Sequence, residues 1–245
     1  MPCHLNEYRA VILDIEGTTT PISFVYDVLF PYARTHLADF IETHWASVQE
    51  EVEGLREQVE SDLRAGVEGV VPIASGEEEE VRESVIRNLR WQMDNDRKTT
   101  ALKSLQGKIW RDGYESGALK GVVYDDVLVA LKAWERAGRP VYIYSSGSVA
   151  AQELLFTYST HGDLTVFIEG YFDTTTGPKK EAESYRAICE AIERRCEEVV
   201  FVTDNVDEAR AAREAGVGAY LMDRPGNPAL PEHDFEVLGS LEGLV

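Results

Sequence analysis

The chain has 245 residues, 44% of them hydrophobic, so it can bury a core large enough for one large domain or two small ones. Its 44 Asp and Glu residues outnumber its 24 Lys and Arg residues, and the formal net charge of −20 repels phosphate backbones and anionic membranes. The composition therefore argues against nucleic-acid and membrane partners, and it admits a small anionic substrate only where local positive charge reverses the average field.

The first predicted element is a buried strand over residues 10–13, and two carboxylates follow it directly. Because side chains alternate along an extended chain, Asp14 and Glu16 fall on the same face, and Gly17 permits a tight turn away from the strand. Ligands bind beyond the carboxyl ends of strands in an open parallel sheet, so this pair is a candidate metal and phosphoryl site. Taken alone, Asp14 is better explained by an ordinary strand-end turn.

The segment from residue 22 to residue 118 has no buried-strand pattern and is predicted to be helical. We expect helices over residues 24–36, 37–64, 80–93 and 100–110, with an acidic, Gly-rich loop over residues 65–79.

After Val123 the helix and strand patterns alternate, as in a parallel sheet with right-handed crossovers. We expect strands over residues 141–144, 199–203 and 218–222, and helices over 125–137, 149–158, 181–196 and 205–215. The predicted fold class is therefore α/β. Its parallel-sheet core, residues 1–21 and 119–245, is split after the first strand by the helical insertion 22–118.

The second predicted strand ends in Ser145-Ser146-Gly147-Ser148, directly before a predicted helix. Hydroxyls and free backbone N–H groups at a helix N-terminus form an anion site, because the helix dipole and the unsatisfied donors both favour phosphate. An ordinary N-cap serine explains the same residues when they are taken singly.

Positive and acidic side chains follow later in the chain. The loop Gly177-Pro178-Lys179-Lys180 offers a lysine that can neutralise a carboxylate and a phosphate together, although lysines in loops are usually only solvated. The strand over 199–203 ends in Asp204, Asn205 and Asp207, and carboxylate oxygens are the ligands that Mg²⁺ prefers. Each signal is weak alone, but the four together, in this order along the chain, favour a site for phosphoryl chemistry.

This order of motifs resembles the haloacid dehalogenase (HAD) superfamily of aspartyl phosphatases, in which Asp-x-Asp-x-Thr precedes a Ser or Thr, a Lys and an acidic metal motif. The chain departs from that pattern at Glu16, where the second Asp normally stands. Residues 14–25, Asp-Ile-Glu-Gly-Thr-Thr-Thr-Pro-Ile-Ser-Phe-Val, are similar to the opening of the enolase-phosphatase, or acireductone synthase, family. Other segments that match this family are Trp91–Met93, Asp96–Lys103, Leu105–Gly107, Tyr142–Val149 and Arg224–Asn227.

The resemblance implies a HAD-like core with a helical cap over residues 22–118 that recognises the substrate. It implies Asp14 as the nucleophile, Glu16 as the general acid/base and Lys179 as the bridge between phosphate and nucleophile. The implied cofactor is one Mg²⁺ per subunit, bound by Asp14, by the backbone carbonyl of Glu16 and by Asp204.

The resemblance also implies the contacts of the substrate. Ser145 and the N–H groups of Ser146 and Gly147 would hold the phosphate. Within the cap, Arg97 and Lys98 have the best claim to a substrate contact, because a dianionic phosphate ester must be met by positive charge.

The implied substrate is 2,3-diketo-5-methylthiopentyl 1-phosphate of the methionine salvage pathway. One site would enolise it and then hydrolyse the phosphate to give the acireductone 1,2-dihydroxy-3-keto-5-methylthiopentene. Two alternatives stay open, a HAD phosphatase of another small phosphate ester and a non-catalytic metal-binding module like a receiver domain. The long insertion after the first strand disfavours the second.

The cysteines Cys3, Cys189 and Cys196 are too few, and odd in number, for a disulfide framework. Cys189 and Cys196 are expected two turns apart on one helix, too far apart for a bridge. Residues 1–9 lack the apolar core of a secretory signal, and no apolar run approaches the length of a membrane span. We expect a monomer in the cytoplasm, or also in the nucleus of a eukaryotic cell.

Overall fold

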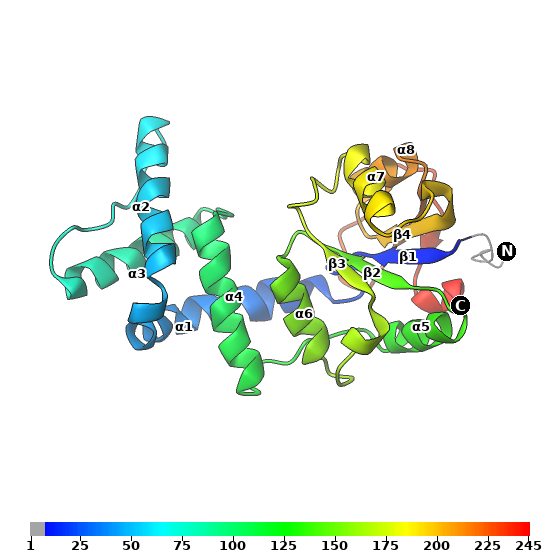
Figure 1. Cartoon of the computed structure of the whole chain (residues 1–245), viewed down its shortest axis with the longest axis horizontal. Coiled ribbons are helices and arrows are strands. Elements are labelled where there is room, and N and C mark those ends of the chain that lie inside the picture. Colours follow the sequence, from blue (N-terminus) through cyan, green and yellow to red (C-terminus); the bar gives the residue numbers. More distant parts are fainter. Residues whose placement is uncertain (1–7) are drawn as a thin grey trace. The chain divides into compact units, whose positions relative to one another are not determined.

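The computed structural model describes residues 8–245 and divides the chain into two compact units (Figure 1). The first combines the N-terminal segment up to Tyr26 with Gly117–Val245, and the second is Asp27–Ser116. Cys3 lies outside the described residues. The first unit is thus discontinuous in sequence, whereas the second is one continuous segment.

The first unit is built on six parallel strands in the order β3-β2-β1-β4-β5-β6. The strands are β1 (Ala10–Leu13), β2 (Val141–Tyr144), β3 (Gly170–Phe172), β4 (Val199–Thr203), β5 (Gly218–Met222) and β6 (Val237–Leu238). Val11 of β1 lies opposite Val141 of β2 and Val200 of β4. The prediction of an α/β fold with a parallel sheet is confirmed.

The strands that sequence predicts are the long, buried ones. All four residues of β1 are fully buried, because a parallel strand covered on both faces has no solvent side. The prediction missed β3 and β6, which have three and two residues. Segments of two or three residues are too short to show the pattern of apolar residues from which a strand is predicted.

Helices cover both faces of this sheet (Figure 1). The helices are α5 (Asp125–Arg136), α6 (Val149–Thr157), α7 (Ala182–Ala191) and α8 (Val206–Glu214). Figure 1 shows α7 and α8 on one side of the strands and α5 and α6 on the other. Ile12 and Phe201 pack with Tyr185 of α7 and Ala212 of α8. Because Asp14 lies two residues beyond Ile12, it emerges on the side of α7 and α8.

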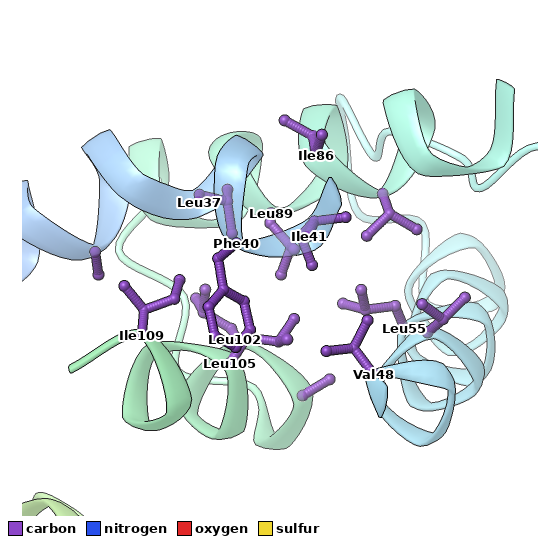
Figure 2. Close-up of a cluster of buried hydrophobic side chains, with 14 of the residues drawn as sticks. Leu37, Phe40, Ile41, Val48, Leu55, Ile86, Leu89, Leu102, Leu105 and Ile109 are labelled. Atoms are coloured by element: carbon purple, nitrogen blue, oxygen red, sulfur yellow. The ribbon is translucent and has the colours of Figure 1, made fainter. Parts of the chain in front are cut away.

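The second unit contains four α-helices and, within 27–116, no strand. The helices are α1 (Phe30–Thr43), α2 (Gln49–Arg64), α3 (Glu78–Asp94) and α4 (Thr100–Glu115). Their apolar side chains meet in a separate core around Leu37, Ile41, Leu55, Leu89 and Leu102 (Figure 2). Across residues 8–245, no helix combines the length and the apolar character that crossing a bilayer requires.

The helix boundaries in the second unit differ from the prediction. A π-helix over Phe24–Leu29 leads into α1, and the first break comes after Thr43 instead of after residue 36. Pro31 lies in the first turn of α1, where its missing N–H and fixed φ are tolerated. The apolar period runs on through residues 36 and 37, so the expected break there is wrong.

The helix expected over residues 181–196 is also shorter. α7 ends at Ala191 because Glu193 has a left-handed φ of 55° and the N–H of Arg194 donates to the Cys189 carbonyl at 2.9 Å. Cys196 then begins a short 3₁₀ helix and packs against the core cluster that contains Cys189. The expectation that both cysteines lie on one helix is therefore wrong.

Candidate active site

The chemistry-bearing side chains lie at the carboxyl ends of three neighbouring strands. Asp14 follows β1, Ser145 follows β2 and Asp204 follows β4. β1 lies between β2 and β4 in the sheet, and this reversal of strand order opens the crevice in which α/β sheets bind ligands. The first unit therefore brings these three residues to one edge.

Asp14 is fixed in a buried network with Lys179. The Lys179 Nζ lies 2.6 Å from Asp14 Oδ1 and 2.7 Å from Glu208 Oε2, and the residues Asp14 and Lys179 are only 3% and 7% exposed. Thr203 Oγ1 lies 2.9 Å from Asp14 Oδ2 and 2.9 Å from Glu208 Oε2. The backbone N–H of Ile15 donates to Asp14 Oδ1 at 2.8 Å. Both oxygens of Asp14 are thereby oriented.

The protonation states in this network follow from burial and charge. Burial opposes the ammonium of Lys179, but the carboxylates of Asp14 and Glu208 outweigh it and raise its pKa. Burial and the charge of Asp14 raise the pKa of Glu208. The Thr203 hydroxyl lies within hydrogen-bond distance of both Asp14 and Glu208, and its one proton can be donated to only one of them at a time.

Glu16 faces Ser145 across the strand ends. The Ser145 hydroxyl donates to Glu16 Oε2 at 3.3 Å and accepts from the N–H of Gly147 at 3.2 Å. Burial and the neighbouring Asp14 carboxylate raise the pKa of Glu16. A raised pKa favours the protonated carboxyl group, which is the form that can deliver a proton to a leaving group.

The segment between β2 and α6 is the candidate phosphate site. Ser148 caps α6, since its Oγ accepts from the N–H of Ala151 at 3.3 Å, and Gln152 Nε2 donates to the Gly147 carbonyl at 2.8 Å. Ser146 is exposed, whereas Ser145 is buried. The Gly147 N–H bonds to the Ser145 hydroxyl, so it becomes a phosphate donor only after that bond opens.

Asp204 lies against the turn that follows Glu16. Gly17 has a φ of 69°, and a Cβ at this position would collide with the Asp204 carboxylate, so only glycine fits the turn. Burial and the charge of Asp14 raise the pKa of Asp204 to about 7. Asp14 and Glu208 contact the single ammonium of the network, and Glu16 and Asp204 interact with it electrostatically.

This donor set fits Mg²⁺, the cofactor that the family resemblance implies. The site offers oxygen donors only, and its acidic groups outnumber its one lysine. Nowhere between residues 8 and 245 could three His, Cys, Asp or Glu side chains alone hold a metal ion. The ligand set that the resemblance implies, two carboxylates and a backbone carbonyl, would leave water and phosphate oxygens to complete the shell of a magnesium ion.

The two predicted substrate contacts of the cap lie in the helical unit and differ in their environment. Arg97 Nη2 lies 2.7 Å from the Asp62 carboxylate, and its guanidinium lies 5.0 Å from the centre of the Trp91 ring. This ion pair is largely buried and joins α2 to the segment after α3. Lys98 is exposed. The charge of Arg97 is thus already balanced, and Lys98 is the better candidate for a ligand contact.

Sequence reasoning missed two members of the network, Thr203 and Glu208. Asp207 was expected at this strand end, but it is exposed and pairs with Lys180 at 3.2 Å. The signal that could have identified Glu208 is its spacing of four from Asp204, which brings two residues to one side of a helix start. Thr203, the last residue of β4, carried no separate signal.

Comparison with known proteins extends this picture. A family model described as haloacid dehalogenase-like hydrolase matches residues 8–216. The chain is 50% identical over 241 residues to a protein of Aedes aegypti named enolase-phosphatase E1, covering 96% of this chain but 22% of that protein. It is 49% identical to the enolase-phosphatase E1 of Anopheles gambiae, covering 96% of this chain and 82% of that protein.

The structural comparison agrees. The UTR4 protein of Saccharomyces cerevisiae is 34% identical in sequence and similar in structure with a TM-score of 0.76, covering 96% of this chain and 99% of that one.

Proposed function

Because the chain belongs to the haloacid dehalogenase-like hydrolases and, within them, to the enolase-phosphatase E1 family, we propose that it enolises 2,3-diketo-5-methylthiopentyl 1-phosphate and then hydrolyses the phosphate, giving the acireductone of the methionine salvage pathway. The observation that carries the proposal is the buried Asp14, hydrogen-bonded through both oxygens, with Lys179 at 2.6 Å. Glu16 lies two residues further on, where the wider superfamily has an aspartate.

Asp14 is the proposed nucleophile. Its attack in line on phosphorus forms an aspartyl-phosphate and releases the substrate oxygen, and water then hydrolyses the acyl phosphate, so one difficult displacement becomes two easier ones. Lys179 keeps its ammonium between Asp14 and Glu208 and stabilises the charge that grows on the phosphoryl oxygens. Thr203 holds the second oxygen of Asp14 and sets the direction of attack.

Glu16 is the proposed general acid/base. With its raised pKa it gives a proton to the leaving oxygen, and as a carboxylate it takes a proton from the attacking water. Its additional methylene extends its reach by about 1 Å compared with aspartate, a difference that matters at catalytic tolerances. We assign this longer reach to the enolisation step.

The remaining groups bind the phosphate. Ser145 with the N–H groups of Ser146 and Gly147 would hold the phosphate, and Lys98 stays the proposed ligand contact of the helical unit. When bound by Asp14, the Glu16 backbone carbonyl and Asp204, Mg²⁺ would neutralise phosphoryl oxygens as a Lewis acid.

A substrate panel tests this function. The purified protein with Mg²⁺ is given the diketone phosphate and a set of sugar phosphates and other small phosphate esters, while inorganic phosphate and the ultraviolet absorbance of the enol are followed. We expect kcat/KM for the diketone phosphate to exceed the others by about 10²-fold or more. Equal turnover of another ester would contradict the assignment of the diketone phosphate as the substrate. Absence of phosphate release from every ester would contradict the proposed phosphatase activity.

A further inference from the structure

The loop directly after the nucleophile is tightly wound. The Ile15 carbonyl accepts from the N–H groups of Thr18, Thr19 and Thr20 at 3.1, 3.0 and 2.9 Å, and the N–H of Gly17 donates to the Thr20 carbonyl at 2.8 Å. All three threonines are fully buried. These bonds use the amides of the loop but leave the carbonyls of Gly17 and Thr18 to other partners.

Those two carbonyls are bound by a second loop, between β5 and β6. Arg224 donates from Nε and from Nη2 to the Thr18 carbonyl, each at 3.1 Å. Asn227 Nδ2 donates to the Gly17 carbonyl at 2.9 Å. Two side chains more than 200 positions downstream therefore hold the backbone that follows Glu16.

Arg224 is itself firmly anchored. It is 6% exposed, its Nη1 lies 2.8 Å from Asp126 of α5, and Nη1 also donates to the Gly239 carbonyl at 3.3 Å. Its guanidinium lies 4.3 Å from the centre of the Tyr124 ring. A buried guanidinium is costly unless its donors find partners, and here the fork bridges the scaffold and Thr18. The loop is thus tied to the rigid part of the unit.

We propose that Arg224 and Asn227 are positioning residues, which hold the loop at Gly17 and Thr18 and thereby set the placement of Asp14 and Glu16 against Asp204. This inference rests on the proposed function. Gly17 already lies so close to Asp204 that a Cβ does not fit between them, so a small shift of the loop changes the distances within the site. Misplacement of a reacting group by about 1 Å costs on the order of 10²-fold in rate, and outer residues commonly set such placement.

Three variants test the proposal. Arg224→Lys keeps a positive charge opposite Asp126 but loses the two-pronged contact with Thr18. Asn227→Ala removes the Gly17 contact without a change of charge. It provides an independent test of the proposal if Arg224→Lys folds poorly. Arg139→Lys is the matched control. Arg139 Nε donates to the Tyr8 carbonyl at 3.1 Å, just before β1 begins, and this contact therefore lies at the amino ends of the strands, away from the site.

Amide hydrogen exchange of residues 15–20 and steady-state kinetics on the diketone phosphate are the two measurements. We expect exchange to be about tenfold faster in Arg224→Lys and kcat to fall at least tenfold with KM changed less than threefold. Asn227→Ala should follow in the same direction with a smaller effect, and Arg139→Lys should stay within twofold of the parent in both measurements.

The proposal is overturned if the loop variants match Arg139→Lys, or if exchange accelerates while kcat stays unchanged. Failure of the proposed function is distinguishable, because exchange needs no substrate. If the parent does not turn over the diketone phosphate, kcat is measured on the ester that it does hydrolyse.

Discussion

The two units bury charged groups in different ways. In the helical unit each buried charge has one opposite partner: Lys108 Nζ lies 2.6 Å from Glu51, and Arg97 lies 2.7 Å from Asp62. At the strand ends of the α/β unit, two carboxyl groups, those of Asp14 and Glu208, share the one ammonium of Lys179. Paired charges fix helices to one another, whereas a surplus of one sign prepares a site for a ligand of the opposite sign.

The pKa values report the same difference. Burial opposes the charge of Glu51, but the hydrogen bonds from Lys108 and Ser104 outweigh burial and lower its pKa. At the strand ends, burial together with the nearby Asp14 raises the pKa of Glu16 and of Asp204. The buried Glu51 carboxylate is thus compensated by its own lysine, whereas at Glu16 and Asp204 burial and the like charge of Asp14 outweigh the attraction of Lys179.

The largest effect is expected from Asp14→Asn, which removes the proposed nucleophile. Phosphate release should fall at least about 10³-fold, or about 4 kcal/mol in transition-state stabilisation. Some enol phosphate should still form if Mg²⁺ remains bound, and stopped-flow absorbance with parallel phosphate detection follows both steps. The exposed Asp207→Asn is the control. Phosphate release by Asp14→Asn at near the parent rate would contradict the aspartyl-phosphate mechanism. Absence of enol phosphate in this variant would show that Asp14 is needed for both enolisation and hydrolysis.

The next effect separates two adjacent lysines. Lys179→Ala should lower kcat by about 10²- to 10³-fold, because the phosphate and Asp14 then face each other without the ammonium. Lys180 is exposed and pairs with Asp207, so Lys180→Ala should change kcat less than about twofold. Steady-state kinetics on both variants, with circular dichroism to verify folding, is the measurement. Equal losses would mean that the wrong lysine has been assigned.

In the helical unit a core substitution should act on stability. Leu89 is fully buried, and Leu89→Ala should destabilise the protein by about 3 kcal/mol through lost burial and the cavity left behind. Leu63, which is 58% exposed, offers the matched Leu63→Ala with an effect below about 0.5 kcal/mol. Urea unfolding compares the two. Equal destabilisation would show that the cluster in Figure 2 does not hold this unit together.

The smallest effect concerns a paired carboxylate of the α/β unit. Burial opposes the charge of Asp126, but hydrogen bonds from Arg224 and the Leu241 N–H outweigh it and lower its pKa. Its contribution, about 1 kcal/mol, is present above the unfolded pKa of about 3.9 and is lost as the pH falls through the lower folded value. Urea unfolding of the parent and Asp126→Asn at pH 6 and pH 2.5 should show a difference that shrinks in acid. A constant difference would contradict the assignment.

Sequence predicted the parts of the fold that rest on apolar patterns. The strands from Ala10, Val141, Val199 and Gly218 each form a continuous apolar run, whereas β3 and β6 are too short for a pattern. The break after Thr43 was missed because the apolar period continues up to it.

For the site, the residue types that follow strands made Asp14, Ser145 and Asp204 candidates, and the structure places all three at the carboxyl ends of neighbouring strands. Arg224 and Asn227 entered the sequence analysis only as part of a segment that matches the family. Their contacts could not be predicted, because they bind backbone carbonyls, and every residue type has a backbone carbonyl. Such contacts need the three-dimensional neighbourhood.

The discontinuity of the α/β unit has a consequence for synthesis on the ribosome. The central strand β1 is translated first, yet Val11 pairs with Val141 and Val200, which are translated much later. The helical unit, in contrast, is complete at Ser116. During elongation the helical unit can therefore fold while β1 remains an apolar segment with two unpaired edges, the type of nascent chain that recruits chaperones.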